Sequence, residues 1–460
     1  MVSHHDLVIV GAGSGNTILD ERFESWDVAI VEEAKFGGTC LNHGCIPTKM
    51  LVSPADLVES IRHADRLGVD ADPPSARWRD IRDRVFGRID PIVDGGAHYR
   101  RSQPHVTVIT GTGVFVGARR MEIVDGIDAG AQVTADRWVI AAGARPTIPE
   151  IPGLDTVAYE TSDTVMRIDE LPQRLLILGG GFIATELAHV YDAFGVDVEL
   201  ITRGPRLLSH HDHEIADAFT AIARDRWNVH LSCAVATAGG SGGEVTLEVE
   251  EPDGSIRPMS GDLLLIATGR SPNSDRLQVT ETGVRVDESG FIETDSTLQA
   301  ADGVWALGDI RTPLMLKHVA NHEARVIQHN LLSPHDPIEA DERAVPHAVF
   351  TSPQIASVGA TTEELLAADR PFVSATRSFG DTAFGWALED TTSMCKIVAD
   401  PTSGDILGAH IMGPQAATLI QQLVQAMRFD LNVERLARDQ MYVHPALTEV
   451  IEQTLLELVD

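Results

Sequence analysis

Cysteine is scarce in this chain, with four residues in 460, namely Cys40, Cys45, Cys233 and Cys395. Four cysteines are too few for the disulfide framework of a secreted protein. Long apolar runs are also missing: no run reaches the roughly 18 residues that cross a membrane, and the N-terminus does not resemble a signal peptide. These absences predict a soluble, cytoplasmic protein in which Cys233 and Cys395 are buried apolar residues.

Positive charge is also scarce. Lys and Arg number 36 against 68 Asp and Glu, so the formal net charge is −32 at pH 7. Such an acidic surface disfavours nucleic acid and anionic membranes as partners. The lysines are only Lys35, Lys49, Lys317 and Lys396.

Two cysteines lie five positions apart in the glycine-rich stretch 36–49. On a regular helix their Cα atoms would be roughly 8–9 Å apart, whereas a disulfide needs less than about 7 Å. A bond between Cys40 and Cys45 therefore requires an irregular backbone, which Gly44 permits, and Pro47 disturbs the first turn of the helix that follows. The pattern predicts a strained, reversible dithiol. The alternative is a pair of buried, unreactive thiols.

The N-terminus carries a dinucleotide-binding fingerprint. Residues 6–10 indicate a buried strand, and the glycine turn 11–16 is expected to lead into a helix. Gly11 allows the tight turn, Gly13 lets the backbone approach a pyrophosphate, and the helix N–H groups would bind the phosphates. The sixth position is Asn16 where Gly or Ala is usual, which predicts looser packing there unless the neighbouring glycine compensates.

The strand that follows ends at Glu32, whose carboxylate can bind ribose hydroxyls. The fingerprint recurs at 175–186, and two dinucleotide sites imply two nucleotide cofactors. The next strand, 198–202, ends at Arg203, where an NAD site usually carries an acid. With Arg206 close by, this favours the 2′-phosphate of NADPH, although both arginines could be solvated surface charges.

A third signal is the apolar strand at 303–309, which ends in Gly308-Asp309. An acid in that place can bind the ribityl chain of a flavin. The chain also contains an Ala-Thr-Gly element at 267–269 and a His-Pro followed by a Glu at 444–449.

Taken in order, these motifs resemble the pyridine nucleotide-disulfide oxidoreductases over the whole chain. The resemblance implies an α/β fold with two Rossmann-like, three-layer domains for FAD and NAD(P) and an α+β C-terminal dimerisation domain. The expected boundaries are 1–150 and 271–340 for the FAD domain, 151–270 for the NADPH domain and 341–460 for the interface domain. Expected local features are a helical insertion at about 50–104, a polar, turn-rich stretch at 111–135, and helices at 415–430 and 446–458.

The resemblance also implies catalytic roles. Cys45 would be the cysteine nearer the flavin, and Cys40 the interchange thiol that attacks the substrate disulfide. A free thiol titrates near 8.5 and needs a base or a cation to react at neutral pH. His444, contributed by the other subunit, would act as acid and base, and Glu449 would orient its ring.

Lys49 and Glu186 are expected to form an ion pair beside the flavin, and helix N–H groups near His318, with Lys317, to stabilise negative charge on the reduced flavin. No metal site is predicted. The cofactor-binding residues expected besides Lys49 and Glu186 are Gly11, Gly13, Ser14, Gly15, Glu32, Gly38, Thr39, Ala142, Gly143, Gly308, Asp309, Lys317, His318, Gly179, Gly181, Ile183, Arg203, Arg206 and Gly269.

Within the family, five stretches are similar to the mycothione reductases: 13–23, 85–91, 316–325, 410–413 and 419–427. This likeness implies FAD and NADPH as cofactors, mycothione as the disulfide substrate and a homodimer with shared active sites. Substrate contacts are expected around Arg22, Tyr99 and Arg325. The alternatives are a dihydrolipoamide dehydrogenase, another low-molecular-weight disulfide reductase and a non-enzymatic flavoprotein redox sensor. A mercuric reductase is disfavoured because no cysteine pair lies near the C-terminus.

Overall fold

The computed structural model describes residues 2–72 and 74–459, which divide into two compact units. Unit 1 comprises Met1–Pro47, Arg82–Thr147 and Gly269–Glu342, and unit 2 comprises Thr48–Ile81, Ile148–Thr268 and Arg343–Asp460. Helices α2 (Cys45–Arg62) and α3 (Trp78–Ser102) each begin in one unit and continue into the other. No helix within the described residues is long and apolar enough to cross a membrane.

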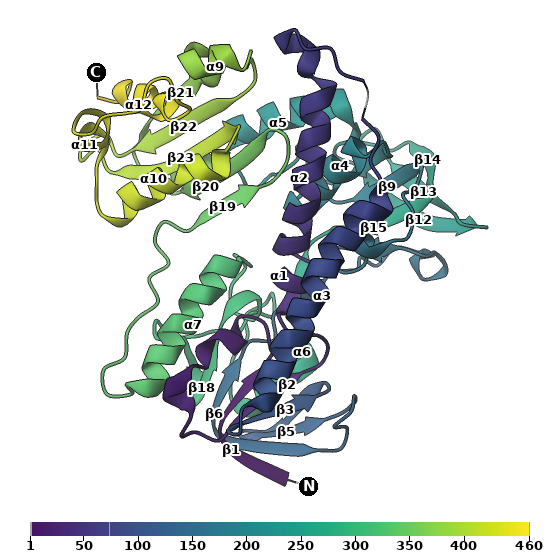
Figure 1. Cartoon of the computed structure of the whole chain (residues 1–460), viewed down its shortest axis with the longest axis vertical. Helices are drawn as coiled ribbons and strands as arrows, with labels where there is room; N and C mark the ends of the chain where they lie inside the picture. Colours follow the sequence, from purple (N-terminus) through teal and green to yellow (C-terminus); the bar gives the residue numbers. More distant parts are fainter. Residues whose placement is uncertain (1, 73, 460) are drawn as a thin grey trace. The chain divides into compact units, whose positions relative to one another are not determined.

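Unit 1 is built on a sheet whose central strands are parallel (Figure 1). Val8 lies opposite Ala29 on one side and Trp138 on the other, which fixes the register of the three innermost strands. The main path runs β17 (Gln299–Ala301), β18 (Val304–Ala306), β6 (Gln132–Ile140), β1 (Val2–Val10), β2 (Val28–Glu32) and β3 (Val106–Thr110). Strands β4 (Gly113–Gly117) and β5 (Arg120–Ile123) extend the sheet from β6, and β7 (Ala144–Pro146) pairs separately with β16 (Arg270–Pro272).

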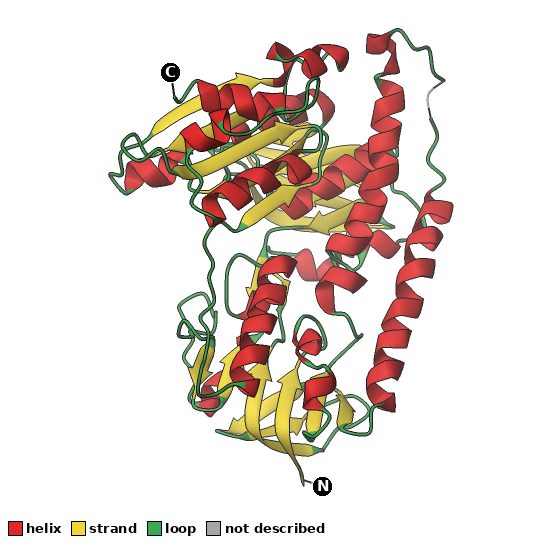
Figure 2. Ribbon diagram, turned by 60° about the vertical axis from the view of Figure 1, so that its left-hand side comes forward, coloured by secondary structure: helices red, strands yellow, loops and turns green. Residues whose placement is uncertain are grey.

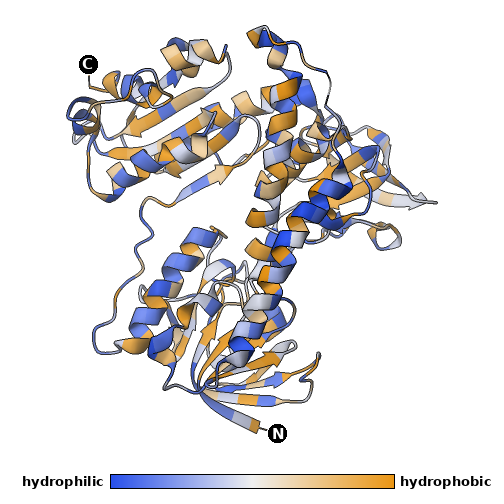
Figure 3. Ribbon diagram, viewed as in Figure 1, coloured by the Kyte–Doolittle hydropathy of each residue, from blue (hydrophilic) through white to orange (hydrophobic). Residues whose placement is uncertain are grey.

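Both faces of this sheet are buried, as expected for parallel strands. Leu7 and Ile9 pack in one core cluster with Ile327 of helix α7 (Lys317–Leu332). Val8 and Val10 point to the other face and pack in a second cluster with Phe115 of β4. Figure 2 shows the helix beside the strands, and in Figure 3 the central strands are coloured mostly as hydrophobic. The alternation of side chains along β1 therefore supplies apolar surface to two layers.

Unit 2 contains a second parallel sheet of five strands. Its order is β11 (Asn228–His230), β10 (Asp197–Ile201), β9 (Arg174–Leu178), β15 (Leu263–Ile266) and β8 (Glu160–Thr161). A three-stranded antiparallel sheet follows, with β12 (Ala234–Ser241), β13 (Glu244–Glu250) and β14 (Ile256–Gly261), and the helices of this part are α4 (Phe182–Ala193) and α5 (His213–Arg226).

The C-terminal part of unit 2 is an antiparallel sheet with helices packed on it. Ile411 of the sheet, Leu423 and Ile451 share one core cluster. The strand order is β19 (Pro346–Val349), β20 (Gln354–Gly359), β23 (Ile406–Gly413), β22 (Met394–Ala399) and β21 (Val373–Ser378). The helices are α8 (Thr362–Ala367), α9 (Ala383–Ala387), α10 (Ala416–Arg428), α11 (Val433–Arg438) and α12 (Glu449–Leu456). Helix α10 corresponds to the helix predicted at 415–430, and α12 to the helix predicted at 446–458.

One sequence expectation was incomplete and another was wrong. The stretch 111–135 has turns at 118–119 and 127–130, as expected, but it also contains β4, β5 and the start of β6. Its buried Phe115, Met121, Ile123 and Val133 give this part of the sheet a covered apolar face. The first glycine turn is not followed by an α-helix. It leads only into the short 3-10 helices Gly15–Ile18 and Glu21–Phe23, because residues 11–27 must turn and return to the start of β2.

Candidate active site

The Cys40 and Cys45 side chains form a disulfide, with their Cα atoms 4.9 Å apart. Cys40 lies in the short helix α1 (Gly38–Asn42), and Cys45 begins α2. The helix is interrupted between them, as the sequence predicted. A Cβ at Gly44 would lie 2.9 Å from the Thr39 carbonyl oxygen, so glycine allows the chain to close on itself here. The other cysteines, Cys233 and Cys395, are free and buried, as expected.

The redox loop is held against the first glycine turn. The Gly37 N–H donates to the Ala12 carbonyl at 3.0 Å. A Cβ at Gly38 would come within 2.7 Å of the Gly13 Cα, so the two backbones touch at a pair of glycines. Asn42 is buried and donates to the Gly38 carbonyl. The disulfide is therefore positioned beside the turn that the sequence assigns to a dinucleotide.

Glycines shape this first turn in two ways. Gly11 has φ +102°, and a Cβ there would lie 2.4 Å from the Ala141 carbonyl oxygen. A Cβ at Gly15 would lie 2.7 Å from the Ala141 Cβ and 2.9 Å from Ile9 Cγ2. Gly15 therefore supplies the close packing that the sixth fingerprint position usually gives, which compensates for Asn16.

Glu32 closes the turn from the end of β2. Its Oε2 accepts the Ala12 N–H at 2.6 Å, and its Oε1 accepts the Ala34 N–H at 2.9 Å. Burial raises the pKa of this carboxyl, although both backbone hydrogen bonds oppose the shift. The carboxylate thus fixes the turn while its remaining lone pairs suit ribose hydroxyls.

Segments far apart in the sequence bring further polar groups to unit 1. Lys317, at the start of α7, donates to Ser14 Oγ at 2.8 Å. Burial raises the pKa of Asp309, and the charges of Arg270 and Lys317 oppose that rise. The buried carboxylate of Glu323 was missed from the sequence; it accepts the Gly308 N–H at 2.5 Å and fixes the Gly-Asp turn. His318 is exposed and Thr39 is half-buried.

A second set of glycines leaves open space. Gly143 has φ +64° and Gly269 has φ +124°, and a Cβ on either would meet nothing within 4 Å. Asn273, also missed from the sequence, donates from Nδ2 to the Ala142 carbonyl at 2.9 Å. Carboxylates, a lysine and open glycine backbone together fit a flavin dinucleotide, so unit 1 has the residues that would hold FAD.

The second glycine turn lies in unit 2 between β9 and α4. Gly179 has φ +133°, and a Cβ there would lie 2.2 Å from the Ala267 carbonyl oxygen. Gly181 caps α4 and faces open space, since a Cβ would meet nothing within 4 Å. Ile183 is half-buried in the first turn of the helix. This turn has the closed and open sides that a pyridine nucleotide pyrophosphate requires.

The two arginines after β10 differ in their surroundings. Arg203 is exposed and has no hydrogen-bond or ion-pair partner among the described residues. Arg206 is bound to Asp217, with Nε 2.6 Å from Oδ1. Only the first of these guanidinium groups is free for a ligand.

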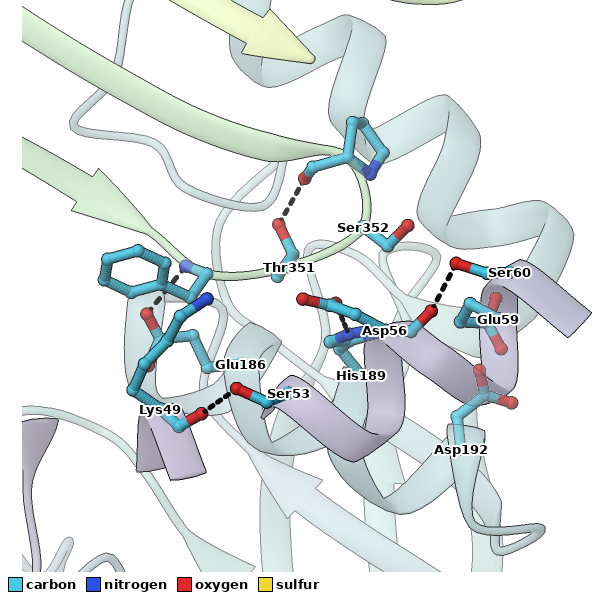
Figure 4. Close-up of polar contacts among 12 residues, drawn as sticks. Lys49, Ser53, Asp56, Glu59, Ser60, Glu186, His189, Asp192, Thr351 and Ser352 are labelled. Atoms are coloured by element: carbon cyan, nitrogen blue, oxygen red, sulfur yellow. Dashed lines mark hydrogen bonds and ion pairs between the residues drawn. The ribbon is translucent and has the colours of Figure 1, made fainter. Parts of the chain in front are cut away.

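Lys49 and Glu186 lie close together, on α2 and α4 (Figure 4). Glu186 is buried, and burial raises its pKa to about 7, while the Phe350 N–H and the charge of Lys49 oppose the rise. Its Oε1 accepts that N–H at 2.8 Å, and the Lys49 ammonium lies 4.4 Å from the centre of the Phe350 ring. The predicted contact ion pair is not among the interactions of the described residues, so Lys49 acts on Glu186 through space.

The same two helices are joined further along by a contact that the sequence did not predict. His189 is fully buried on α4, and its Nε2 lies 2.9 Å from Asp56 Oδ1 of α2 (Figure 4). Arg226 of α5 binds Asp192 at 2.6 Å and Glu59 at 3.3 Å. These contacts fix α2 against α4 beyond Lys49 and Glu186.

His444 and Glu449 lie together in unit 2. His444 Nδ1 is 2.6 Å from Glu449 Oε1, and Glu449 Oε2 accepts the Ala446 N–H at 3.0 Å. The hydrogen bond from His444 lowers the pKa of Glu449. The histidine side chain is 71% exposed, so its ring is oriented by the carboxylate while Nε2 remains accessible.

Comparison with known proteins gives the family. Residues 5–324 match the pyridine nucleotide-disulphide oxidoreductases, and residues 345–455 match the dimerisation domain of these proteins. The chain belongs to the pyridine nucleotide-disulphide oxidoreductase family. It is therefore an FAD-dependent enzyme that uses a pyridine nucleotide, as the motifs predicted, and its C-terminal domain is a dimerisation domain.

Individual relatives span the whole chain. Mycothione reductase of Mycobacterium tuberculosis strain H37Rv is 47% identical over 99% of both chains. Dihydrolipoyl dehydrogenase of Corynebacterium glutamicum is 31% identical over 98% of this chain and 97% of its own length. Among solved structures, the HOCl-induced flavoprotein disulfide reductase RclA from Escherichia coli has a TM-score of 0.84 and 26% identity over 98% of this chain and 99% of its own. The α/β fold with a C-terminal dimerisation domain is thus confirmed.

Three expected substrate contacts remain predictions. Arg22, Tyr99 and Arg325 are all exposed, and Arg22 is engaged with Asp20 through Nη2 at 2.5 Å. The domain boundaries and the catalytic roles of individual residues likewise remain predictions.

Proposed function

We propose that this enzyme reduces mycothione to mycothiol with NADPH. The observation that carries the proposal is the 47% identity, over 99% of both chains, to mycothione reductase of Mycobacterium tuberculosis, against 31% to a dihydrolipoyl dehydrogenase. The free guanidinium of Arg203 after β10 supports NADPH rather than NADH. We also infer a cytoplasmic location, because a single reversible dithiol functions in a reducing compartment.

Glu32, Asp309 and Lys317 would help to hold FAD, which would supply two-electron transfer from NADPH to the Cys40–Cys45 disulfide. The disulfide then opens to two thiols, with one proton from the hydride and one from solvent. The Cys40 thiolate then attacks one sulfur of mycothione, so that an enzyme–substrate disulfide forms and one mycothiol leaves. The Cys45 thiolate attacks Cys40 Sγ, the enzyme disulfide forms again, and the second mycothiol leaves. Two electrons and two protons end on two mycothiol molecules.

The proton transfers need a group near neutral pKa, and histidine has one. Glu449 holds Nδ1 of His444, which leaves Nε2 to take the Cys40 proton and to return a proton to the departing thiolate. The side chain of His444 is largely exposed within a single chain, which supports its use across a dimer. We therefore assign the acid–base role to the partner's His444.

Steady-state rates with different substrates test the proposed specificity. NADPH and NADH should each be measured against mycothione, glutathione disulfide, lipoamide and bis-γ-glutamylcystine. We expect the highest kcat/KM for NADPH with mycothione, and at least ~100-fold less for glutathione disulfide, or about 3 kcal/mol of transition-state stabilisation. Equal or faster turnover of lipoamide with NADH would favour the dihydrolipoamide dehydrogenase alternative.

The shared active site has its own test. His444→Ala should slow disulfide turnover by roughly 100-fold or more, as loss of a positioned acid and base does, and leave reduction of the flavin by NADPH nearly intact. Mixing His444→Ala chains with Cys40→Ser chains should restore part of the activity through hybrid dimers. A fully active monomer, or no recovery in proven hybrids, would contradict the assignment.

A further inference from the structure

Arg100 of α3 is a buried arginine bound to the first glycine turn. Its side chain is 7% exposed. Nε donates to Asn16 Oδ1 at 2.7 Å, and Nη2 donates to the carbonyls of Asn16 at 2.8 Å and Leu19 at 3.1 Å. Nη1 donates to Gln103 Oε1 at 2.8 Å. Four of the five guanidinium N–H groups are thus used, three of them by the fingerprint segment.

The turn needs these donors because it lacks the long helix of an ordinary fingerprint. Its 3-10 helix ends at Ile18, and the carbonyls at the end of any helix have no partner within it. Arg100 satisfies those of Asn16 and Leu19, and Gln328 of α7 donates to that of Ile18 at 2.7 Å. Side chains from two other helices therefore replace the backbone bonds of the missing helical turns.

The charge of Arg100 is not balanced by a carboxylate. Within the described residues, no ion pair of Arg100 is present, and burial lowers its pKa without opposition from any acidic neighbour except the Tyr99 phenol. Arginine nevertheless remains protonated in proteins. A buried cation usually has a counter-ion, and the segment that Arg100 holds is the glycine turn that the sequence assigns to a dinucleotide.

We propose that Arg100 is a positioning residue for FAD: it holds the shortened turn, through Asn16 and Leu19, in the shape that binds the pyrophosphate. Asn16 then has a function in the fingerprint, because its side-chain oxygen accepts the hydrogen bond that orients the Arg100 guanidinium. The inference does not depend on which disulfide the enzyme reduces.

The test is the affinity of the purified holoenzyme for FAD, measured from the rise in flavin fluorescence when the enzyme is diluted. Arg100→Gln should weaken FAD binding by roughly 10- to 100-fold, as loss of buried hydrogen bonds to a charged donor does. Arg100→Lys keeps the positive charge but loses the planar guanidinium, so its FAD affinity should lie between those of wild type and Arg100→Gln. Arg88→Gln, at an exposed position of the same helix, is the matched control and should bind FAD as wild type does.

A double-mutant cycle separates positioning from general stabilisation. Asn16→Ala should weaken FAD binding in the wild-type background and have little further effect with Arg100→Gln. On heating, the flavin of the variants should be released before the protein unfolds by circular dichroism, whereas a merely structural role would lower both midpoints together. FAD affinity within twofold of wild type for Asn16→Ala and Arg100→Lys would overturn the proposal, even if Arg100→Gln failed to fold.

Discussion

The two glycine turns of this enzyme begin in the same way and continue differently. Each follows a parallel strand, and in each the first glycine has positive φ and lies against a carbonyl, Ala141 for Gly11 and Ala267 for Gly179. The turn in unit 2 then enters the long helix α4, whereas the turn in unit 1 enters a four-residue 3-10 helix.

The difference shows which parts of the fingerprint depend on local geometry. The tight turn depends on a glycine at the first position, because a Cβ would strike backbone in both cases. The helix is replaceable, since Arg100 and Gln328 bind the carbonyls that a longer helix would satisfy itself. The carbonyls of the shortened helix thus depend on donors from distant segments, whereas α4 can satisfy such carbonyls with its own backbone N–H groups.

The largest expected effect tests what the turns share. Gly11→Ala should cost about 3 kcal/mol or more, because it combines positive-φ strain with a clash against backbone, and the purified protein should contain little FAD. Gly179→Ala should keep its FAD and lose NADPH binding for the same reason. The flavin-to-protein absorbance ratio and NADPH titration measure the two losses. A Gly11→Ala protein with a full complement of FAD would show that the turn adapts.

The second prediction tests where the turns differ. Gly15→Ala places a Cβ against Ala141 and Ile9, and should destabilise the holoenzyme by about 1–3 kcal/mol through overpacking. Gly181→Ala enters open space and should change thermal stability little, although it lies where a pyrophosphate would approach. Paired thermal unfolding experiments and NADPH titrations distinguish these outcomes. Equal destabilisation by both substitutions would contradict the assignment of close packing to Gly15.

The sequence predicted what spacing and local chemistry determine. The redox pair, both glycine turns, Glu32 and the His444–Glu449 contact lie where the motifs placed them. Each of these features is formed by residues that are close in sequence, or by a residue that directly follows a buried strand.

What could not be predicted depends on packing between distant segments. Arg100 reaches Asn16 across 84 positions, and His189 reaches Asp56 across 133; no local pattern marks either pair. An α-helix after Asn16 was predicted but is not formed, because the glycine pattern determines the turn and not the length of the helix that follows it. The strands within 111–135 were missed because β4 and β5 are only five and four residues long, and turn residues separate them.

The third prediction concerns the charged residue at the end of the strand that follows each glycine turn, β2 in unit 1 and β10 in unit 2. β2 ends with Glu32, which holds its own turn, whereas β10 is followed by Arg203, which is free. Arg203→Leu should weaken NADPH binding about tenfold and leave NADH binding unchanged, because one charge-assisted contact to the 2′-phosphate is lost. Arg206→Leu should have a smaller effect, since its guanidinium is already bound to Asp217. Equal losses for NADPH and NADH would exclude a role in 2′-phosphate recognition.

The smallest effect concerns Glu186, for which the first turn has no counterpart. Burial raises its pKa from 4.5 to about 7, so the folded protein binds this proton more tightly than the unfolded chain. The resulting contribution to stability is complete below pH 4.5 and is lost as the pH rises through about 7. Lys49→Met removes the opposing positive charge and should move the titration to higher pH. Infrared difference spectra of the carboxyl, with Glu186→Gln to identify its band, would measure the shift; an unchanged titration would mean that Lys49 does not act on this carboxyl.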